Sequence, residues 1–356
     1  MAKILYYVSG HGYGHISRSY EITKELLQNE NHSITIVSGR IDFIQETHPR
    51  LERRKISVDV GIYQKDSLSL DVKKTAIALK EFEDHKNDIL KNELEFIRQN
   101  DFDMILSDCA SLPFVMGAEM GIPAVFIGNF TWDFIYRHYN SEDPYFGVIA
   151  HIMQVEYSFA TIAIQLPFSC PIEGFQKIYP VGLVGRKPKL TKEEAKQKYR
   201  MKEGEVHFLL SFGAYGLEGQ NWEWRKMPSH WKLYTSGTPG ANPDFVIHID
   251  TDHYPDLVTA VDYVVTKPGY GIISECIFAD TPILYTERGN FAEYPFLTQG
   301  LEESIPSAYL SRKDLLEFRW FEAIEKIQSE KRSNKRWIGS REGAKEVVEI
   351  LQQYIS

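Results

Sequence analysis

The chain has 356 residues, of which 43% are hydrophobic and 25% charged, and its formal net charge is −9 at pH 7. This length exceeds what one hydrophobic core usually supports, so two domains are expected. The acidic balance argues against general nucleic-acid binding, which needs basic surface to neutralise phosphates. The three cysteines, Cys109, Cys170 and Cys276, have no C-x-x-C spacing, so neither a zinc motif nor a disulfide framework is expected.

The opening segment, MAKILYYVSG, is an apolar run too short for a signal peptide. No later run approaches the roughly 20 apolar residues of a transmembrane helix. We therefore expect a cytoplasmic protein.

The first half of the chain alternates predicted strands and helices. The strands are expected at residues 3–9, 33–38, 102–108 and 123–129, and two more follow a helix at 144–159. Between them we expect a helix through about residue 28, a long charged helix at 71–100 and a helix ending at Gly121. This β-α-β repetition predicts a parallel sheet covered by helices on both faces.

The pattern then stops and restarts. Residues 183–194 are polar, contain a proline and precede a helix, so we interpret them as a linker. A strand at 205–213 runs into glycines, and residues 262–287 read as strand, glycine turn, helix and strand. The sequence therefore predicts an α/β protein with two doubly wound, Rossmann-like domains, residues 1–182 and 195–338, that face a central cleft. We expect residues 339–356 to form a helix that covers a sheet face or crosses back to the first domain.

Two glycine-rich segments of the second half indicate an anion site. In TKPGYGIISE, Gly269 and Gly271 follow a strand and open a helix, where backbone N–H groups and the helix dipole favour phosphate. Glu275 lies a little over one turn into that helix and could accept hydrogen bonds from a ribose diol. A purely structural turn fits this segment equally well, but the second cluster, SFGAYGLEG at 211–219, favours diphosphate binding.

The segment YYVSGHGYGHISRS places two histidines among glycines directly after the first strand. A metal site, a phosphate cradle and a general base are all compatible with this composition. Two metal ligands spaced as in H-x-x-x-H would need a helix, but Gly12 and Gly14 lie between the histidines and no third ligand is evident. We therefore expect no metal here.

Five segments together carry a family resemblance: YYVSGHGYGHISRS, ILSDCASLP, GNFTWDFIY, LPFSCP and VTKPGYGIISECIFADTPILYTERGNFAEYPFL. Their order resembles the glycosyltransferase-like N-terminal half of plant L-arabinokinase and its free-standing bacterial relatives, to about residue 300. These look like GT-B glycosyltransferases, related more distantly to the peptidoglycan N-acetylglucosaminyltransferase and UDP-glycosyltransferases. The galactokinase-like half is absent, so sugar kinase activity is not implied.

The resemblance implies an inverting, metal-independent glycosyltransferase that moves a sugar from a nucleoside diphosphate donor, expected to be a UDP-sugar, to an acceptor hydroxyl without a cofactor. It places the donor in the second domain. The implied diphosphate contacts are Gly213, Ala214, Gly269, Tyr270 and Gly271. Glu275 would hold the ribose, while Asn290 and Glu293 would face the donor sugar. The acid–glutamine pair that commonly reads the sugar is replaced here by RGNFAE, so the sugar is not identified.

On the acceptor side, His15 matches the Gly-His position of the catalytic base, and Asp108 would accept its imidazole N–H. A helix N-cap is the alternative role of Asp108. The expected acceptor-side residues are His11, Gly12, Gly14, Arg18, Asn129 and Trp132. For His11 a structural loop role is favoured over catalysis, and Trp132 could stack on a sugar or belong to the core. Arg18 could meet an anionic acceptor group or point to solvent.

Two other functions stay open on the sequence alone. The same donor site could serve a nucleotide-sugar hydrolase or epimerase, or a catalytically inactive sugar-nucleotide-binding module. No nucleic-acid partner is expected, and membrane contact would be at most peripheral, if the acceptor is lipid-linked.

Overall fold

The computed structural model describes residues 2–66, 68–213, 220–236, 245–332 and 336–355. The chain divides into two compact units. Unit 1 comprises Met1–Tyr63, Asp71–Gly185 and Gly339–Ser356, and unit 2 comprises Gln64–Leu70 and Arg186–Ile338. None of the helices in the described ranges is long and apolar enough to cross a bilayer.

Unit 1 is built on a seven-stranded parallel sheet with the order β3-β2-β1-β6-β7-β8-β9. The strands are β1 (Ala2–Val8), β2 (His32–Val37), β3 (Leu51–Arg54), β6 (Met104–Asp108), β7 (Ala124–Gly128), β8 (Ile162–Gln165) and β9 (Ile178–Pro180). The central strands are buried along almost their whole length, as expected for a sheet covered on both faces. The strand order reverses between β1 and β6, which makes the carboxyl edge of these two strands the expected ligand position.

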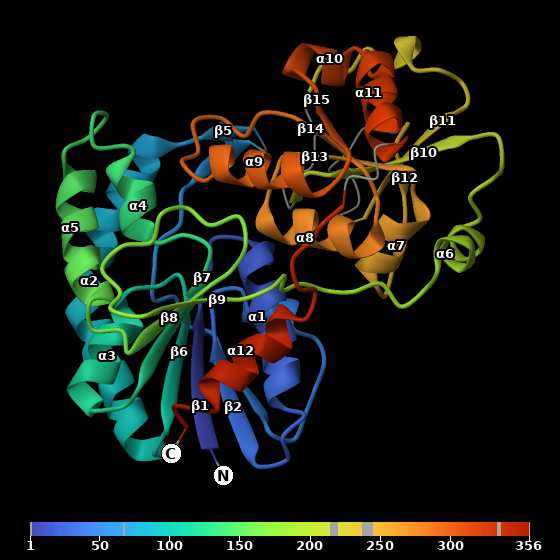
Figure 1. The fold of residues 1–356 in the computed structure, drawn as a ribbon. Helices are drawn as coiled ribbons and strands as arrows, with labels where there is room; N and C mark the ends of the chain where they lie inside the picture. The colour runs from blue at the N-terminus through green and yellow to red at the C-terminus, as the bar shows by residue number, and fades with distance from the viewer. Residues whose placement is uncertain (1, 67, 214–219, 237–244, 333–335, 356) are drawn as a thin grey trace. The chain divides into compact units, whose positions relative to one another are not determined.

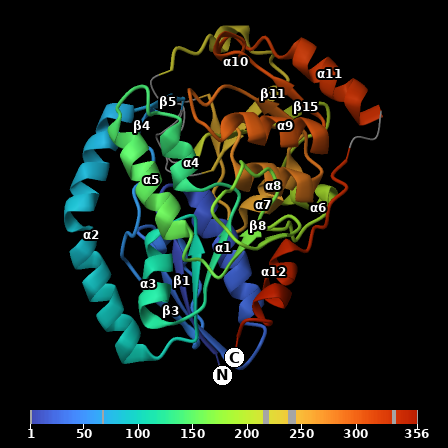
Figure 2. The ribbon, with the colours of Figure 1, turned by 60° about the vertical axis from the view of Figure 1, so that its left-hand side comes forward.

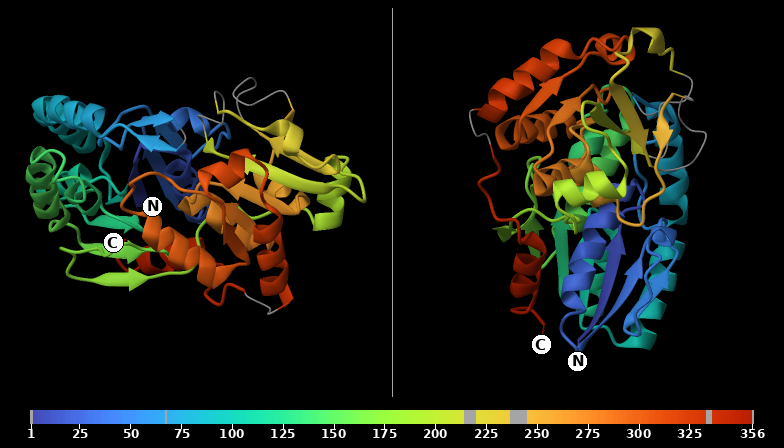
Figure 3. Two further views of the ribbon diagram at one scale, coloured as in Figure 1. Left: turned by 90° about the horizontal axis from the view of Figure 1, so that it is seen from above. Right: turned by 90° about the vertical axis from the view of Figure 1, so that its right-hand side faces the viewer.

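The helices of unit 1 fall into two groups. They are α1 (Tyr13–Leu26), α2 (Val72–Asn100), α3 (Leu112–Met120), α4 (Trp132–Arg137), α5 (Tyr145–Tyr157) and α12 (Gly343–Leu351), with a 3₁₀ turn at Ile41–Phe43. Helix α1 packs against α12, whereas α3 packs against α2 and α5 (Figures 1 and 2). Right-handed crossovers that leave the switch point in opposite directions put their helices on opposite faces of the sheet. The C-terminal helix thus lies beside the N-terminal one, and both chain ends lie at the same end of unit 1 (Figure 3).

Unit 2 repeats the design with a six-stranded parallel sheet in the order β12-β11-β10-β13-β14-β15. Its strands are β10 (Val206–Ser211), β11 (Trp231–Thr235), β12 (Ile247–His248), β13 (Tyr263–Thr266), β14 (Ile283–Tyr285) and β15 (Ser307–Tyr309). Its helices are α6 (Lys192–Lys198), α7 (Tyr254–Ala260), α8 (Tyr270–Ala279), α9 (Tyr294–Ser304), α10 (Arg312–Leu316) and α11 (Phe321–Arg332), with a 3₁₀ turn at Trp224–Lys226. The switch point lies between β10 and β13. The predicted α/β class with two doubly wound sheets is confirmed.

Two details differ from the sequence prediction. Helix α6 begins at Lys192, inside the segment interpreted as a linker, and residues from Arg186 onward already belong to unit 2. A hairpin, β4 (Gln64–Asp66) and β5 (Ser69–Leu70), belongs to unit 2 although unit 1 surrounds it in sequence. Its Leu68 is buried in the apolar core of unit 2 with Phe208 and Trp231. Gly289 lies against it, with a positive φ of 66° and only 3.1 Å between an added Cβ and the Leu68 carbonyl oxygen, so glycine is needed there.

Candidate active site

The two predicted catalytic side chains lie at the switch point of unit 1. Strands β1 and β6 are paired in parallel with Val8 opposite Asp108, so the chain segments that follow them leave the same edge of the sheet. The glycine-rich segment crosses this edge and enters α1 at Tyr13, with Gly12 as the N-cap in extended conformation. His15 therefore stands in the first turn of α1, directly above the end of β6.

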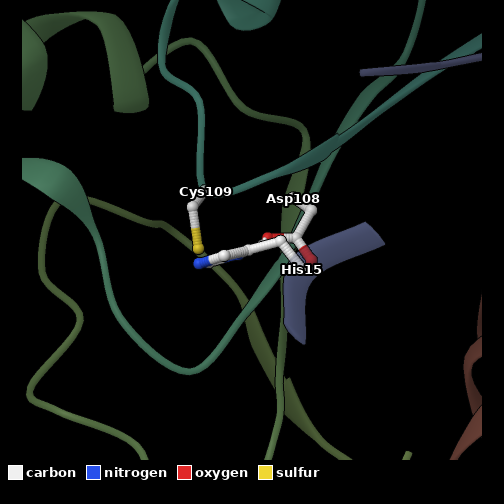
Figure 4. Close-up of side chains that lie close together, drawn as sticks. All are labelled: His15, Asp108 and Cys109. Carbon is white, nitrogen blue, oxygen red and sulfur yellow. Dashed lines mark hydrogen bonds and ion pairs between the residues drawn. The ribbon is translucent and has the colours of Figure 1, made fainter. Parts of the chain in front are cut away.

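His15 and Asp108 form a short, buried pair. The distance between His15 Nδ1 and Asp108 Oδ1 is 2.7 Å, and the two residues are 7% and 0% exposed. The ring of Phe130 packs edge-on against the imidazole at 5.5 Å. The side chains of His15, Asp108 and Cys109 converge on one point, as Figure 4 shows.

Arg18 is the third member of this cluster and does not point to solvent. It is 2% exposed. Its Nε donates to Asp108 Oδ2 at 2.7 Å and its Nη2 to Asp108 Oδ1 at 2.9 Å. Ser19 donates a further hydrogen bond to Oδ2 at 3.0 Å. Burial alone would raise the pKa of Asp108, but the positive charge of Arg18 and the hydrogen bonds from Arg18 and His15 outweigh burial and hold this pKa well below its usual range.

The alternative role of Asp108 as a helix N-cap is not realised. Helix α3 begins at Leu112, and its N-cap residue is Ser111. The Asp108 side chain turns instead toward α1. An ionised Asp108 accepts the Nδ1 hydrogen of His15, which leaves Nε2 as the basic nitrogen of the ring.

The other acceptor-side residues lie behind or beside the histidines. The His11 ring packs edge-on against Trp132 at 5.2 Å and lies 6.2 Å from the His15 ring. Trp132 and Asn129 are fully buried, and Asn129 Oδ1 accepts a hydrogen bond from Arg18 Nη1 at 2.6 Å. The two histidines are therefore more accessible to an acceptor than Trp132 and Asn129 are. Gly14 lies in the first turn of α1 and brings no side chain between His11 and His15.

Sequence reasoning missed Asp59, a second buried carboxylate beside the glycine-rich segment. Its Oδ2 accepts the indole N–H of Trp132 at 2.8 Å, and its Oδ1 lies 3.4 Å from the Gly10 nitrogen. Burial raises the pKa of Asp59 above its usual value, although hydrogen bonds from Ser9 and Trp132 oppose this. Asp59 stands in an irregular segment between β3 and β4, where no motif or periodicity marks it.

His15, Asp108 and Cys109 also form a geometric candidate for a metal site, because their ligand atoms lie within 4.8 Å of one another. However, Arg18 Nη2 already approaches all three, at 3.2 Å from His15 Nδ1, 2.9 Å from Asp108 Oδ1 and 3.4 Å from Cys109 Sγ. Burial also raises the pKa of the Cys109 thiol well above its usual value, which disfavours the thiolate. A guanidinium in the middle of the cluster repels a cation, so these residues fit a metal poorly.

The two glycine segments predicted to bind the diphosphate begin at the switch point of unit 2. Strands β10 and β13 are paired with Ser211 opposite Thr266, so both glycine segments leave one edge of the sheet. Gly213 follows β10 with a positive φ of 71°, while Ala214 lies outside the described residues. Gly269 is the N-cap of α8, and Tyr270 and Gly271 form its first turn. The N–H groups of this first turn have no acceptor within the helix itself, and they lie at the carboxyl edge of the sheet.

Two carboxylates of this region are paired with arginines. Glu275 is 3% exposed and bound by Arg186, whose Nε and Nη2 reach Oε1 at 2.7 and 2.6 Å. Glu293, also 3% exposed, accepts a hydrogen bond from Arg288 Nη1 at 3.0 Å. Asn290 is exposed on the connection between β14 and α9.

Neither arginine was predicted as part of the site. Arg288 begins the RGNFAE segment directly after Glu287, and its Nη1 also lies 3.2 Å from the Pro268 carbonyl oxygen, next to Gly269. Among the described residues its buried Nε has no hydrogen-bond partner. The basic residue at the carboxyl edge of β14 was the available sequence signal.

Comparison with known proteins gives one clear sequence relative. The chain is 30% identical over 360 residues to L-arabinokinase of Arabidopsis thaliana, a match that covers 98% of this chain. The chain spans about a third, 34%, of the length of that relative. No protein-family profile matches the chain.

Solved structures with little sequence similarity share the fold over the whole chain. A UDP-glucosyltransferase from Polygonum tinctorium superposes with a TM-score of 0.65 at 13% identity, covering 100% of this chain and 99% of that one. The calicheamicin glycosyltransferase CalG4 gives 0.65 at 17% identity, covering 99% and 98%. UGT2 of Phytolacca americana, solved with UDP-2-fluoro-glucose and pterostilbene, gives 0.61 at 12% identity, covering 100% of both chains. The expected resemblance to L-arabinokinase and the expected likeness in fold to GT-B glycosyltransferases are confirmed.

Proposed function

We propose that this chain, which has the GT-B glycosyltransferase fold, transfers a sugar from a nucleoside diphosphate to an acceptor hydroxyl with inversion at the anomeric carbon. The observation that carries the proposal is the buried His15–Asp108 pair at the switch point of unit 1, with 2.7 Å between Nδ1 and Oδ1. A sugar hydroxyl is a poor nucleophile at neutral pH, and an imidazole oriented by a carboxylate is a suitable base for it.

The proposed step is a direct displacement. Nε2 of His15 takes the proton of the acceptor hydroxyl as the new oxygen–carbon bond forms. The bond from the anomeric carbon to the diphosphate oxygen breaks, and its electron pair leaves with the diphosphate. The backbone N–H groups at Gly269, Tyr270 and Gly271 would stabilise the charge that develops there. Asp108 stabilises the imidazolium that results.

We propose that the reaction needs no metal ion. A divalent cation commonly neutralises a leaving diphosphate, but the cluster of potential ligands around His15 is already occupied by the Arg18 guanidinium. Instead, the N-terminus of α8 and the neighbouring Arg288 would provide the positive electrostatic potential that stabilises the leaving diphosphate of the donor.

We propose a UDP-sugar as the donor, supported by the fold shared with proteins described as a UDP-glucosyltransferase and as a complex with UDP-2-fluoro-glucose. Glu275 would bind the ribose, and Asn290 and Glu293 would face the sugar. Gly213 and Ala214 would line the other side of the diphosphate. Reaction with a cytosolic donor would place the enzyme in the cytoplasm.

The test is a panel of UDP-, GDP- and dTDP-sugars screened by thermal shift, followed by turnover with sugar acceptors. A donor at about 100 times its Kd should add roughly 2.7 kcal/mol to the free energy of unfolding. We expect release of nucleoside diphosphate that depends on the acceptor, formation of an inverted glycoside, and activity that persists in EDTA.

The other outcomes separate the alternatives. Release of nucleotide and free sugar without an acceptor would identify a hydrolase, and a changed sugar on an intact nucleotide would identify an epimerase. Binding without turnover across many acceptors would identify a sugar-nucleotide-binding module. Loss of activity in EDTA, restored by Mg²⁺ or Mn²⁺, would refute the metal-independent mechanism.

A further inference from the structure

A cluster of Tyr13, Arg40 and Phe43 lies at the carboxyl edge of the sheet of unit 1, near the proposed base. Tyr13 opens α1 two residues before His15. Arg40 and Phe43 follow β2, which pairs in parallel with β1, and β1 pairs in parallel with β6. Because these three strands are adjacent and parallel, the segments that follow them leave the same edge of the sheet as His15 and its carboxylate partner.

The three side chains of the cluster pack on one another. The Tyr13 ring lies 5.4 Å from the Phe43 ring, tilted by 34°. The guanidinium of Arg40 lies 5.0 Å from the centroid of the Tyr13 ring. Arg40 Nε donates to the Gly10 carbonyl oxygen at 2.8 Å, which fixes the guanidinium on the glycine-rich segment. Tyr13 is nevertheless 44% exposed, so the cluster combines an oriented guanidinium with an accessible aromatic ring.

Arg40 carries a positive charge without a neutralising partner in the described ranges. No carboxylate of these ranges pairs with Arg40, and its two Nη atoms have no hydrogen-bond acceptor there. Asp42, the acidic residue nearest to it in sequence, is paired with Lys55 instead. A planar guanidinium fits the two oxygens of a carboxylate or phosphate with parallel hydrogen bonds. The partly buried Arg40 can therefore offer two adjacent donor groups to an anion.

The neighbouring residues leave this role to Arg40. An added Cβ at Gly12 would meet no atom within 4 Å, so the backbone next to Tyr13 leaves room for a ligand. Arg18, the residue first expected to meet an anionic acceptor group, is 2% exposed and bound to Asp108. A cation that reaches an acceptor at this edge is thus supplied by Arg40 rather than by Arg18.

We propose that Arg40 and Tyr13 form an acceptor subsite for a sugar that carries an anionic group, a carboxylate or a phosphate. The guanidinium would bind the anion, and the Tyr13 ring would pack on the sugar. The segments after β2 and β6 are two strand spacings apart, roughly 10 Å, which a monosaccharide with its substituents can bridge. One acceptor could then place its anion at Arg40 and a hydroxyl at His15. This inference rests on the proposed function, which gives His15 its role.

The experiment measures the binding of glucose, glucuronate and glucose 6-phosphate to the full chain by ligand-observed NMR titration. We expect the unmodified protein to bind at least one anionic sugar about tenfold more tightly than glucose, the scale of a charge-assisted hydrogen bond. The sugar with the higher affinity identifies the anion as carboxylate or phosphate. Arg40→Gln should bring its affinity to within about twofold of glucose, with glucose binding unchanged. Arg98→Gln, at an exposed arginine in the last turn of α2, is the matched control and should preserve the preference.

Two further variants complete the series. Tyr13→Ala should weaken all three sugars alike, by about threefold, because it removes a packing surface and no charge. Arg40→Lys provides a second measurement if Arg40→Gln does not fold. An ammonium keeps the charge but lacks the two-donor fork, so the preference should fall to about threefold.

Three results would overturn the inference and leave the proposed function intact. They are equal binding of the three sugars by the unmodified protein, an unchanged preference in Arg40→Gln (or in Arg40→Lys when only that variant folds), and an equal loss for glucose and the anionic sugars. In the last case Arg40 would only order the glycine-rich segment through Gly10. A preference that depends on Arg40, without transfer to any acceptor, would support the anion site and refute the proposed transferase.

Discussion

The two units each carry an arginine–carboxylate pair at the carboxyl edge of their sheet, and the two pairs differ in how far water reaches them. In unit 1, Arg18 and Asp108 have side chains that are 2% and 1% exposed. In unit 2, the side chain of Arg186 is 26% exposed, and that of its partner Glu275 is 4% exposed. The first pair is closed and the second is accessible from one side.

This difference matches the tasks that we assign to the two sites. A base and its orienting carboxylate must keep one geometry through many turnovers, and a fully bonded Arg18 restricts the Asp108 carboxylate to that geometry. A nucleotide must enter and leave, so the group that binds it needs an open side. We therefore expect the extent to which each arginine–carboxylate pair is buried to distinguish a rigid catalytic site from a site whose nucleotide enters and leaves.

The largest effect is expected for His15→Ala. Loss of the base should lower turnover by about 10² to 10⁴, with donor affinity nearly unchanged because the donor residues belong to unit 2. Steady-state kinetics and calorimetry on the same preparation measure both quantities. His151→Ala, which removes an exposed histidine of α5, is the control. Near-native transfer by His15→Ala would show that the base lies elsewhere.

Arg18→Met should destabilise the protein by about 3–5 kcal/mol, because it leaves the buried Asp108 charge without its main partner. Arg186→Gln should cost about 1–2 kcal/mol, since water can reach Glu275 once the arginine is removed. Urea unfolding gives both values. Lys24→Met, at a half-exposed lysine of α1, should stay within about 0.5 kcal/mol. Equal costs for the two arginines would contradict the comparison between the closed and the accessible pair.

The depressed pKa of Asp108 predicts a loss of stability in acid. Its contribution is complete above the usual aspartate pKa of about 3.9 and is lost as pH falls toward the lower pKa of the folded state. For one salt-bridged aspartate this amounts to roughly 2 kcal/mol. Urea unfolding between pH 6 and pH 3 should therefore show a steeper acid loss for the unmodified protein than for Asp108→Asn. Parallel curves would mean that Asp108 does not carry this charge in the folded state.

The smallest effect is expected for His11→Ala. The His11 ring packs on Trp132 and closely against Gly61, where an added Cβ would lie 2.2 Å from Nδ1, so His11 fits a packing role. We expect turnover to fall by about threefold to tenfold, which is much less than the loss expected for His15→Ala. Steady-state kinetics of both variants under the same conditions give the ratio of their turnover numbers. An equal loss at both histidines would make His11 part of the catalytic group.

Much of this architecture could be predicted from the sequence, because parallel sheets leave strong local signals. Buried strands such as Ala2–Val8 and Met104–Asp108 read as apolar runs, and glycine segments mark the turns that follow them. From these two features the sequence predicts that His15 and Asp108 lie at the carboxyl edge of one sheet, and the parallel pairing of β1 with β6 brings them together there.

The partners of the predicted residues could not be foreseen in the same way. Arg18, Arg186 and Asp59 act through contacts with residues 90, 89 and 73 positions away, and no local period encodes such distances. Arg18 looked equally suited to solvent, because its position in a helix turn does not reveal what the neighbouring strand presents. Pairing of charges in the interior is a property of the assembled sheet.

The hairpin at Gln64–Leu70 has a consequence for how such a protein can be taken apart or recombined. The chain passes between the units after Tyr63, Leu70, Gly185 and Ile338, so no single cut separates them. A fragment ending at Gly185 would carry away Leu68, a piece of the other unit's core, and would lack the C-terminal helix that packs on α1. Exchange of donor specificity by recombination must therefore transfer residues 64–70 together with 186–338, and a chimera joined only at residue 185 should be less soluble than one joined at all four crossings.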